Sequence, residues 1–331
     1  MATVIDVAQR AGVSLATVSR ALNGHATVSA EMRDKVNAAA LALDYRPNPM
    51  AQGLRKGQSN TVALLVGDIA QRHFAELTMH VQSALEESGA DLLLFNLGHS
   101  QRRLEDFLGR APSMRLRGVA LALSDTVPKS TAPLFDSLWD SGITVVSIGQ
   151  NLTRYGVPSI VHEERAASQR SVAYLLDKGH TRIAYVGRIK GSAIGTERFR
   201  GYQAAMQKAG VFDESLVWEK TFRYSAGRDA VLEALDRGIA FTGLQAGSDE
   251  IATGAMAALR DRGLNVPEQV AIVGFGDVEM GAYLRPALTT LSSHPDLAAQ
   301  HLRDMFKSNA APPERTSLTL LDRALVVRGS A

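Results

Sequence analysis

The sequence predicts a small all-α head followed by an α/β core that is built as two similar lobes. Three observations support this prediction. Apolar residues recur at helical spacing through residues 1–44, short apolar runs alternate with helical patterns from residue 61, and the alternation occurs twice, over 61–160 and 160–290. A chain of 331 residues is long enough to form more than one domain.

The head is expected to contain three helices. In TVIDVAQRAG, Thr3 is a candidate N-cap, and apolar residues recur at helical spacing until Gly12 ends the helix. Ser14 is the candidate N-cap of a second helix over 15–22, and Ser29 is the candidate N-cap of a third. Two short helices joined by a tight turn form a helix-turn-helix pattern, although an ordinary helical hairpin has the same pattern.

A hinge and linker are expected after the head, over residues 47–60. This part of the chain is rich in Pro and Gly and ends in polar residues. Asn48 can cap a short helix on which Ala51 and Leu54 share a face, but a helix this short is not stable alone in water. Gly53 lowers helix propensity by about 1 kcal/mol relative to alanine, so we expect this segment to be more disordered when free, or to couple the head and the core more weakly.

The core is expected to contain parallel sheets. Apolar runs such as TVALLVGD, GVALALSD, RIAYVG and VAIVGFGD alternate with helical patterns such as HFAELTMHVQSALEESG. Continuous apolar strands separated by helices indicate parallel sheets that are covered on both faces, as in Rossmann-like lobes. Ligands in such folds bind beyond the carboxyl ends of the strands, so we expect the ligand site in the cleft between the lobes.

Composition and charge narrow the class of function. The absence of cysteine excludes disulfides, thiolate metal sites and cysteine nucleophiles, and fits a cytoplasmic protein. The start of the chain is not expected to be a signal peptide. The sequence contains no run of about 18 apolar residues, so we expect no membrane span. The eight histidines are scattered, so we expect neither a metal site nor a cofactor.

Positive charge is concentrated in the head. Residues 1–60 carry seven Lys or Arg against four Asp or Glu, whereas the remainder carries 29 against 30. A basic head on a near-neutral body favours contact with a polyanion. In a helix-turn-helix the leading end of the second helix meets base edges, so Leu15 and Ala16 are expected to face bases there. Ser14 and Thr17 can contact phosphates, and Arg20 can bind the O6 and N7 atoms of guanine together.

The string TVIDVAQRAGVSLATVSRALNG closely resembles the head of the lactose-repressor (LacI/GalR) family of bacterial transcription regulators. The segments DKGHTRIAYVG, SDEIATGAMAALRDRGLNVPEQVAIVGF and ALVVRGSA resemble the same family, in its usual order, so that the resemblance spans essentially the whole chain. It implies a helix-turn-helix domain and a two-lobed periplasmic-binding-protein-like core that binds the effector and dimerises. The implied ranges are head 1–46, hinge and linker 47–60, core 61–331, N-lobe about 61–160 plus 292–320, and C-lobe about 161–291 plus 321–331.

The resemblance also implies a function. Members are sequence-specific DNA-binding regulators, commonly repressors, that bind a pseudo-palindromic operator as homodimers and respond to a sugar or related metabolite. Release by an inducer is the commoner response, but a corepressor remains an alternative. Leu54 matches a leucine that wedges into the minor groove, although a plain linker or packing role is also open. The implied DNA-contacting residues are Thr3, Ser14, Leu15, Ala16, Thr17, Ser19, Arg20, Asn23, His25, Asn48, Ala51 and Leu54.

An effector site is implied by position as well. Arg198 can hold two hydroxyls or a carboxylate, with a surface salt bridge as the alternative, and Phe222 can stack on a ring unless it is a core aromatic. Acidic residues found in members that bind neutral sugars are replaced by His162 and Gly276, so we expect an anionic effector unless Asp277 restores the lost carboxylate. The implied effector residues are His73, Phe74, Ser124, His162, Arg198, Phe222, Ser248, Asp249 and Asp277.

Two other classes of protein are alternatives to this interpretation. GFGDVE begins like a dinucleotide fingerprint, but Glu279 occupies the third glycine position, and no P-loop, HExxH or GxSxG motif occurs. A solute-binding receptor for transport would share the core, but it would need an export signal and no basic helical head. We therefore expect a regulator without enzymatic activity.

Overall fold

The computed structural model describes residues 2–22, 27–45, 59–307 and 311–331. The chain divides into two compact units, a head that ends at Ser59 and a core that begins at Asn60. Several residues of the predicted DNA-binding set lie outside the described residues, together with the hinge glycine. They are Asn23, His25, Asn48, Ala51, Gly53 and Leu54.

The head contains the three predicted helices, α1 (Val4–Ala11), α2 (Leu15–Leu22) and α3 (Ala30–Ala42). Thr3 begins α1 as a capping box, in which its hydroxyl oxygen accepts from the Asp6 N–H and the Asp6 carboxylate accepts from the Thr3 N–H. Gly12 ends α1 in the left-handed conformation, with φ of 63°. The Ser14 hydroxyl oxygen accepts from the Thr17 N–H at 3.1 Å and so caps the first turn of α2.

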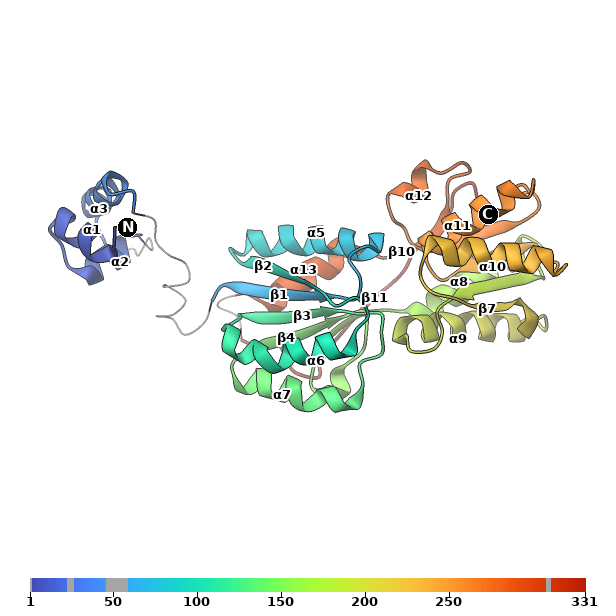
Figure 1. Cartoon of the computed structure of the whole chain (residues 1–331), viewed down its shortest axis with the longest axis horizontal. Helices are drawn as coiled ribbons and strands as arrows, with labels where there is room; N and C mark the ends of the chain where they lie inside the picture. The colour runs from blue at the N-terminus through green and yellow to red at the C-terminus, as the bar shows by residue number, and fades with distance from the viewer. Residues whose placement is uncertain (1, 23–26, 46–58, 308–310) are drawn as a thin grey trace. The chain divides into compact units, whose positions relative to one another are not determined.

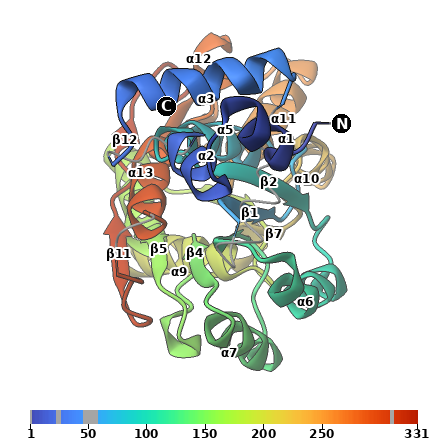
Figure 2. The ribbon, with the colours of Figure 1, turned by 90° about the vertical axis from the view of Figure 1, so that its left-hand side faces the viewer.

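Small side chains form the core of the head. Val7, Ala11, Val18, Ala21 and Val36 are buried together, and α1, α2 and α3 all contact one another. Figure 2 shows the long α3 lying beside the two shorter helices. Because the buried side chains are small, the helices approach closely and most of the surface of α2 stays available for contact.

The N-lobe is a parallel sheet of six strands in the order β11-β5-β4-β3-β1-β2. Helices α5 and α13 cover one face, and α6 and α7 cover the other (Figure 1). The strands are β1 (Thr61–Val66), β2 (Asp91–Asn96), β3 (Gly118–Ala122), β4 (Thr144–Ile148), β5 (Ser159–His162) and β11 (Leu318–Leu321). The helices are α5 (Arg72–Glu87), α6 (Gln101–Arg110), α7 (Ala132–Asp140) and α13 (Pro295–Met305).

The C-lobe repeats this plan in the order β12-β10-β9-β8-β6-β7, with only β12 antiparallel. Helices α8 and α9 cover one face, and α10 and α11 cover the other (Figure 1). The strands are β6 (Ile183–Gly187), β7 (Val217–Glu219), β8 (Gly243–Ala246), β9 (Ala271–Gly276), β10 (Thr289–Ser292) and β12 (Leu325–Val326). The helices are α8 (Glu164–Asp177), α9 (Ala193–Lys208), α10 (Tyr224–Asp236), α11 (Asp249–Asp261) and α12 (Met280–Tyr283).

Short 3-10 helices lie in the connections of both lobes. They are η1 (Ala111–Met114), η2 (Lys129–Thr131), η3 (Thr153–Tyr155) and η4 (Glu214–Leu216). The predicted fold class is confirmed, because a helical head precedes two parallel α/β lobes. None of the helices in the described part of the chain is both long and apolar enough to cross a bilayer.

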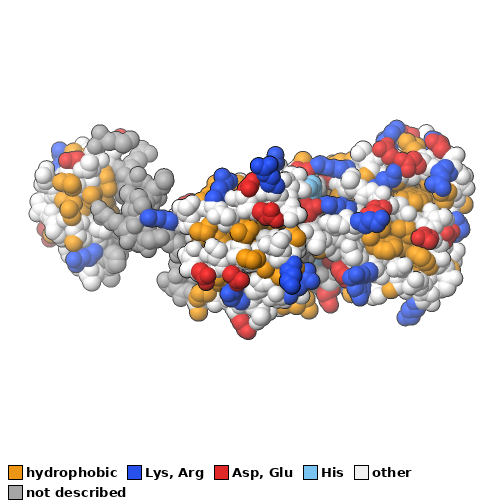
Figure 3. All heavy atoms as spheres, turned by 60° about the horizontal axis from the view of Figure 1, so that its bottom comes forward, with side chains coloured by type: hydrophobic (Ala, Val, Ile, Leu, Met, Phe, Trp, Pro, Cys, Tyr) orange, Lys and Arg blue, Asp and Glu red, His pale blue; other side chains and the backbone are white. Residues whose placement is uncertain are grey.

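The chain crosses between the lobes three times. The crossings follow β5, β10 and β11, and they lead into α8, α13 and β12. Each lobe is therefore assembled from segments that are distant in the sequence. Acidic and basic side chains are interspersed over the face of the core that Figure 3 shows, in agreement with its near-balanced charge.

Candidate DNA-binding face and interlobe cavity

Helix α2 presents its leading end to solvent. Leu15 is 45% exposed, Ala16 and Arg20 are also exposed, and Val18 and Ala21 are buried on the opposite side of the helix. The exposed Leu15 and Ala16 give the leading end an apolar contact, and Arg20, in the last turn of α2, gives the same helix a cationic one. Both contacts suit the edges of base pairs.

The hydroxyl-bearing residues near α2 also have local roles. Ser14 and Thr17 lie with their hydroxyl oxygens 2.9 Å apart, and Ser14 is exposed while Thr17 and Ser19 are half-buried. The Thr3 hydroxyl donates to the Asp6 carboxylate at 2.9 Å. Hydrogen bonds from the Thr3 backbone and hydroxyl lower the pKa of Asp6 and keep the capping carboxylate ionised.

A cavity lies between the two lobes of the core, at the carboxyl ends of their strands. Gln71, His73, Phe74 and Ser124 line it from the N-lobe, and α9, α11 and the segment after β9 line it from the C-lobe. Of the nine predicted effector residues, seven line this cavity: His73, Phe74, Ser124, Arg198, Phe222, Ser248 and Asp249.

The other two predicted residues lie elsewhere. His162 lines a smaller adjoining cavity that shares His73, Phe74 and Arg323 with the first. Asp277 lines neither cavity, because its carboxylate pairs with Arg328 at 2.6 Å. In this structure Asp277 therefore does not replace the acidic residue that the sequence lacks at Gly276.

The free volume of the interlobe cavity is about 60 Å³. A cavity of roughly 150 Å³ accommodates a benzene ring, so this one has room only for water or a small group. A ligand as large as a sugar therefore requires the lobes to separate or the lining side chains to move.

Arg198 is held by a buried carboxylate. Its Nε and Nη2 donate to Glu164 at 2.8 and 3.2 Å, and its Nη1 donates to the Gly247 carbonyl at 2.6 Å. The pair is not the surface salt bridge considered above, because Arg198 is 8% exposed and Glu164 is 4% exposed. The guanidinium lies 4.4 Å from the centre of the Phe275 ring.

A second arginine shares the same carboxylate. Arg323 is 2% exposed and donates through Nη2 to Glu164 at 2.7 Å. Burial alone would raise the pKa of Glu164, but the charges of Arg198 and Arg323 outweigh burial and hold it well below its ordinary value. The cluster of Arg198, Glu164 and Arg323, called the arginine–glutamate cluster below, thus carries a net charge of about +1.

Sequence reasoning missed Glu164 and Arg323. The only available signal for Arg323 is a charged residue between two apolar stretches, LTLL and ALVV. Its partner lies 159 positions earlier, so no local spacing connects the two residues.

The histidines of the site are uncharged near neutral pH. Burial, with the charge of Arg323 as the next cause, lowers the pKa of His73 to about 4 and of His162 to about 3. His162 Nε2 donates to the Ser293 carbonyl at 2.5 Å, which assigns its ring proton to that nitrogen. The positive charge of the site therefore comes from the arginines alone.

Two carboxylates of α11 also line the cavity. Burial raises the pKa of Asp249 to about 6, although it accepts from the Val278 N–H at 2.9 Å and from the Thr290 hydroxyl at 2.5 Å. Burial also raises the pKa of Glu250, which accepts from the Arg72 N–H of the other lobe at 2.8 Å. Both groups are thus more easily neutralised than an exposed carboxylate.

Phe222 and Ser248 have structural roles beside their place in the lining. Phe222 is 7% exposed and packs into the apolar core of the C-lobe, so it is a core aromatic that also faces the cavity. The Ser248 hydroxyl oxygen accepts from the Ile251 N–H at 3.3 Å and caps α11.

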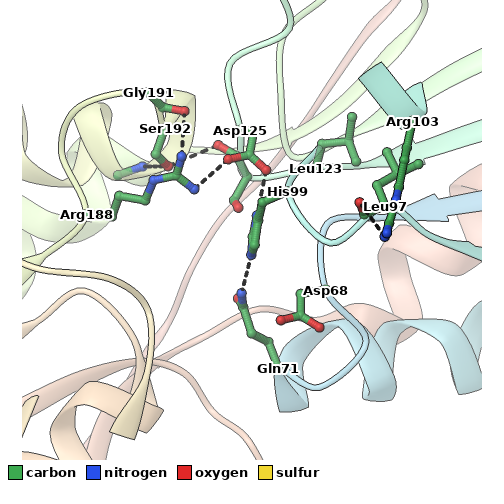
Figure 4. Close-up of polar contacts among 12 residues, drawn as sticks. Asp68, Gln71, Leu97, His99, Arg103, Leu123, Asp125, Arg188, Gly191 and Ser192 are labelled. Atoms are coloured by element: carbon green, nitrogen blue, oxygen red, sulfur yellow. Dashed lines mark hydrogen bonds and ion pairs between the residues drawn. The ribbon is translucent and has the colours of Figure 1, made fainter. Parts of the chain in front are cut away.

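Ion pairs join the two lobes of the core. Asp125 of the N-lobe pairs with Arg188 of the C-lobe at 2.5 Å, and His99 Nδ1 donates to the same carboxylate at 2.6 Å (Figure 4). The Gln71 amide donates to His99 Nε2 at 3.0 Å, and Asp68 pairs with Arg223 across the lobes. We call Gln71, His99, Asp125 and Arg188 the mouth network.

Within the mouth network, Asp125 is held in its ionised form. Burial alone would raise the pKa of Asp125, but the hydrogen bond from His99 and the charge of Arg188 outweigh it and lower that pKa.

Among the described residues, no group of three His, Asp or Glu side chains is arranged to hold a metal ion.

The head and part of the core each match a known protein family. Residues 3–48 match the family described as bacterial regulatory proteins, lacI family, and residues 172–331 match a periplasmic binding protein-like domain. The HTH-type transcriptional regulator AscG of Escherichia coli (strain K12) is 32% identical over 296 residues, which cover 88% of this chain and 87% of the relative. The ribose operon repressor of Escherichia coli (strain K12) is 29% identical over 338 residues, which cover 100% of both chains.

Solved structures with the same architecture extend the comparison. The transcriptional regulator CelR–cellobiose complex matches with a TM-score of 0.71 and 29% identity over 100% of both chains. The lac repressor dimer bound to operator and the anti-inducer ONPF matches with a TM-score of 0.87 and 23% identity, over 99% of this chain and 98% of that one. At that identity the second likeness concerns the fold alone.

Proposed function

The chain belongs to the LacI family of bacterial regulatory proteins, and we propose that it is a repressor whose affinity for operator DNA depends on a small molecule bound between the core lobes. Membership makes it a DNA-binding transcription regulator rather than an enzyme. The observation that carries the proposal is the joint presence of a three-helix head with an exposed leading end of α2 and a two-lobed core with a lined cavity.

In this proposal the head, residues 1–46, binds the major groove. Leu15 and Ala16 contact base edges, and Arg20 binds a guanine. Ser14 and Thr17 contact phosphates at the N-terminus of α2, where the helix dipole favours anions. The family resemblance implies that Thr3, Ser19, Asn23 and His25 also contact DNA.

The hinge, within residues 47–60, is proposed to fold on DNA. Two heads of a homodimer bind an inverted repeat, and their hinge helices lie side by side in the minor groove, each capped by Asn48. Ala51, on the same face as Leu54, is proposed to contact DNA, and Leu54 enters the groove at the operator centre and bends the duplex there. These residues lie outside the described part of the structure, so the proposal for them comes from the sequence alone.

The effector is proposed to be a sugar or a sugar-derived metabolite, in the interlobe cavity. Two relatives are named for such compounds, the ribose operon repressor and the CelR–cellobiose complex. The effector is further proposed to be anionic, because the arginine–glutamate cluster carries excess positive charge and the lining histidines are neutral. Calorimetry with an aldose and its aldonate tests this point, and tighter binding of the neutral aldose would contradict it.

Effector binding is proposed to change how the lobes close. The movement alters the distance between the N-lobes of the dimer and so favours or opposes pairing of the hinge helices. A coupling of about 1–3 kcal/mol is typical of such systems. Induction, in which the effector releases the protein from DNA in the cytoplasm, is the primary proposal, and corepression is the alternative.

The deciding experiment is selection of bound duplexes from a random pool by the full-length protein, followed by gel shift. We expect enrichment of one inverted repeat and a gel shift that weakens steeply as salt rises, because phosphate contacts release counterions. Equal retention of symmetric and scrambled duplexes, with or without sugar metabolites, would overturn the proposal.

A further inference from the structure

Arg323 contacts all three segments that cross between the lobes. It lies on the third crossing itself, between β11 and β12. Its Nη2 donates to Glu164 on the first crossing at 2.7 Å, and its Nη1 donates to the Ser292 carbonyl on the second crossing at 3.0 Å. A single buried guanidinium therefore connects the segments about which the lobes move relative to each other.

One N–H donor of the same guanidinium has no hydrogen-bond partner in the described structure. Arg323 Nε is buried and has no hydrogen-bond partner within the described structure, and the same is true of Ser124 Oγ. Both residues line the interlobe cavity. A buried polar atom without a partner is costly, so a site that contains two of them is suited to a ligand that supplies acceptor oxygens.

The acidic groups of the site already have donors of their own. Glu164 accepts from both arginines, Asp249 accepts from Val278 and Thr290, and Glu250 accepts from the backbone of the other lobe. A ligand therefore gains little by donating to these carboxylates, and it gains more by accepting from Arg323. The arginine–glutamate cluster carries an excess positive charge of its own, so the part of the lining beside Arg323 favours a negatively charged acceptor, whereas Asp249 and Glu250 oppose one elsewhere in the lining.

We propose that Arg323 is a specificity-determining residue of the effector site, and that its Nε–H binds an oxyanion of the effector, a carboxylate or a phosphate. This assignment rests on the proposed function, in which the same cavity takes the effector. Because Arg323 also holds the three crossings, an oxyanion bound to it changes the contacts that set lobe closure. Arg323 thus connects recognition of the effector to the movement of the lobes.

Two probes distinguish a carboxylate from a phosphate. The full-length protein is heated with D-gluconate, with inorganic phosphate, with neutral D-glucose, or with chloride at equal ionic strength, and the unfolding midpoint is measured. We expect at least one oxyanion to raise the midpoint in a saturable way that chloride does not reproduce. The anion that is effective identifies the kind of acidic group.

Variants with opposite expected effects separate recognition from stability. Arg323→Gln should weaken apparent oxyanion binding about tenfold or more, because a charge-assisted hydrogen bond is lost. Glu164→Gln removes the competing carboxylate, so it should tighten oxyanion binding even though the unliganded variant is less stable. A purely structural role would weaken the oxyanion response in both variants. Arg303→Gln, on the surface of α13, is the matched control and should respond like the wild type.

Three results would overturn the proposal: no oxyanion-specific rise in the wild type, an undiminished rise in Arg323→Gln, or a lost rise in Glu164→Gln. If Arg323→Gln does not fold, Arg323→Lys keeps a charge but loses Nε, and its response must still be weaker than that of the wild type. Operator binding is measured separately by gel shift. An oxyanion response without operator binding would support the site and contradict the proposed function.

Discussion

Arg20 illustrates how a single exposed side chain connects fold to function. It lies in the last turn of α2, exposed, while Val18 and Ala21 are buried beside it. Its guanidinium is therefore free to face a groove without disturbing the core of the head. The sequence predicted this division correctly, because helical periodicity separates the two faces of a short helix.

Arg20→Ala should relax the base preference at one position of each half-site. Loss of a bidentate contact costs about 1–3 kcal/mol of discrimination against the wrong base. Affinity measured over a library of operator variants tests this expectation. Arg10→Ala, at the exposed end of α1, is the control and should weaken all sequences about equally. If Arg20→Ala keeps the wild-type base preference at every operator position, Arg20 does not read a base.

His162→Gln should make the protein less sensitive to acid. The folded-state pKa of His162 is lowered from 6.5 to about 3, so its contribution to stability is fully present above pH 6.5 and is lost as pH falls toward 3. At about 1.4 kcal/mol per pKa unit, the loss is on the order of 5 kcal/mol. The amide of glutamine does not titrate and can still donate to Ser293.

Urea unfolding at a series of pH values between 7 and 4 measures this effect. The free energy of unfolding should fall less steeply in His162→Gln than in the wild type. His301→Gln, on the exposed side of α13, controls for the substitution. Parallel curves for wild type and His162→Gln would show that burial of His162 is not the cause of acid sensitivity.

At the scale of elements, the hinge depends on its surroundings more than any other predicted helix. The head helices begin with caps and bury one face, whereas the hinge sequence contains Gly53 and is too short to be stable alone. Its proposed partner is the minor groove together with the second hinge of the dimer. Coupling between core and operator is therefore expected to pass through this element.

Leu54→Ala should weaken specific binding and leave weak non-specific binding intact. The wedge contributes only where the duplex bends, whereas phosphate contacts of the head act on any sequence. Gel shifts with the selected operator and with a random duplex measure the two affinities. Equal losses on both duplexes would contradict the wedge role of Leu54.

The strands and helices of the core were largely predictable, whereas the arginine–glutamate cluster was not. Apolar runs such as TVALLVGD form strands that are buried on both faces, because such strands need apolar side chains at consecutive positions. Glu164 and Arg323 lie on separate crossings and meet only when both lobes are formed. Their pairing comes from the topology of the whole core, which local pattern does not encode.

At the scale of the whole molecule, the contacts between lobes set the balance between closed and open forms. The mouth network and the Asp68–Arg223 pair span the lobes, and the interlobe cavity, which Gln71 also lines, is too small for a sugar. Weakening these contacts should therefore favour the open form. Half-buried ion pairs contribute modestly, so the shift is expected to be on the order of 1 kcal/mol.

Asp125→Asn should lengthen the mean distance between the lobes. The chain has no native cysteine, so Met79→Cys and Arg237→Cys, both at exposed positions in different lobes, can be labelled without interference. Distances between the labels then report lobe closure. Asp106→Asn, which breaks an exposed pair within α6, is the control. Identical distance distributions in the two variants would exclude the mouth network from lobe closure.

The three crossings have a consequence for the gene. Strand β11 pairs with β5 in one lobe, β12 pairs with β10 in the other, and Ser330 is fully buried between Ile272 and Thr289. Residues 318–331 therefore complete both sheets. A premature stop codon before Leu318 should be as harmful as one far upstream, and affinity tags placed close to β12 should depress yield.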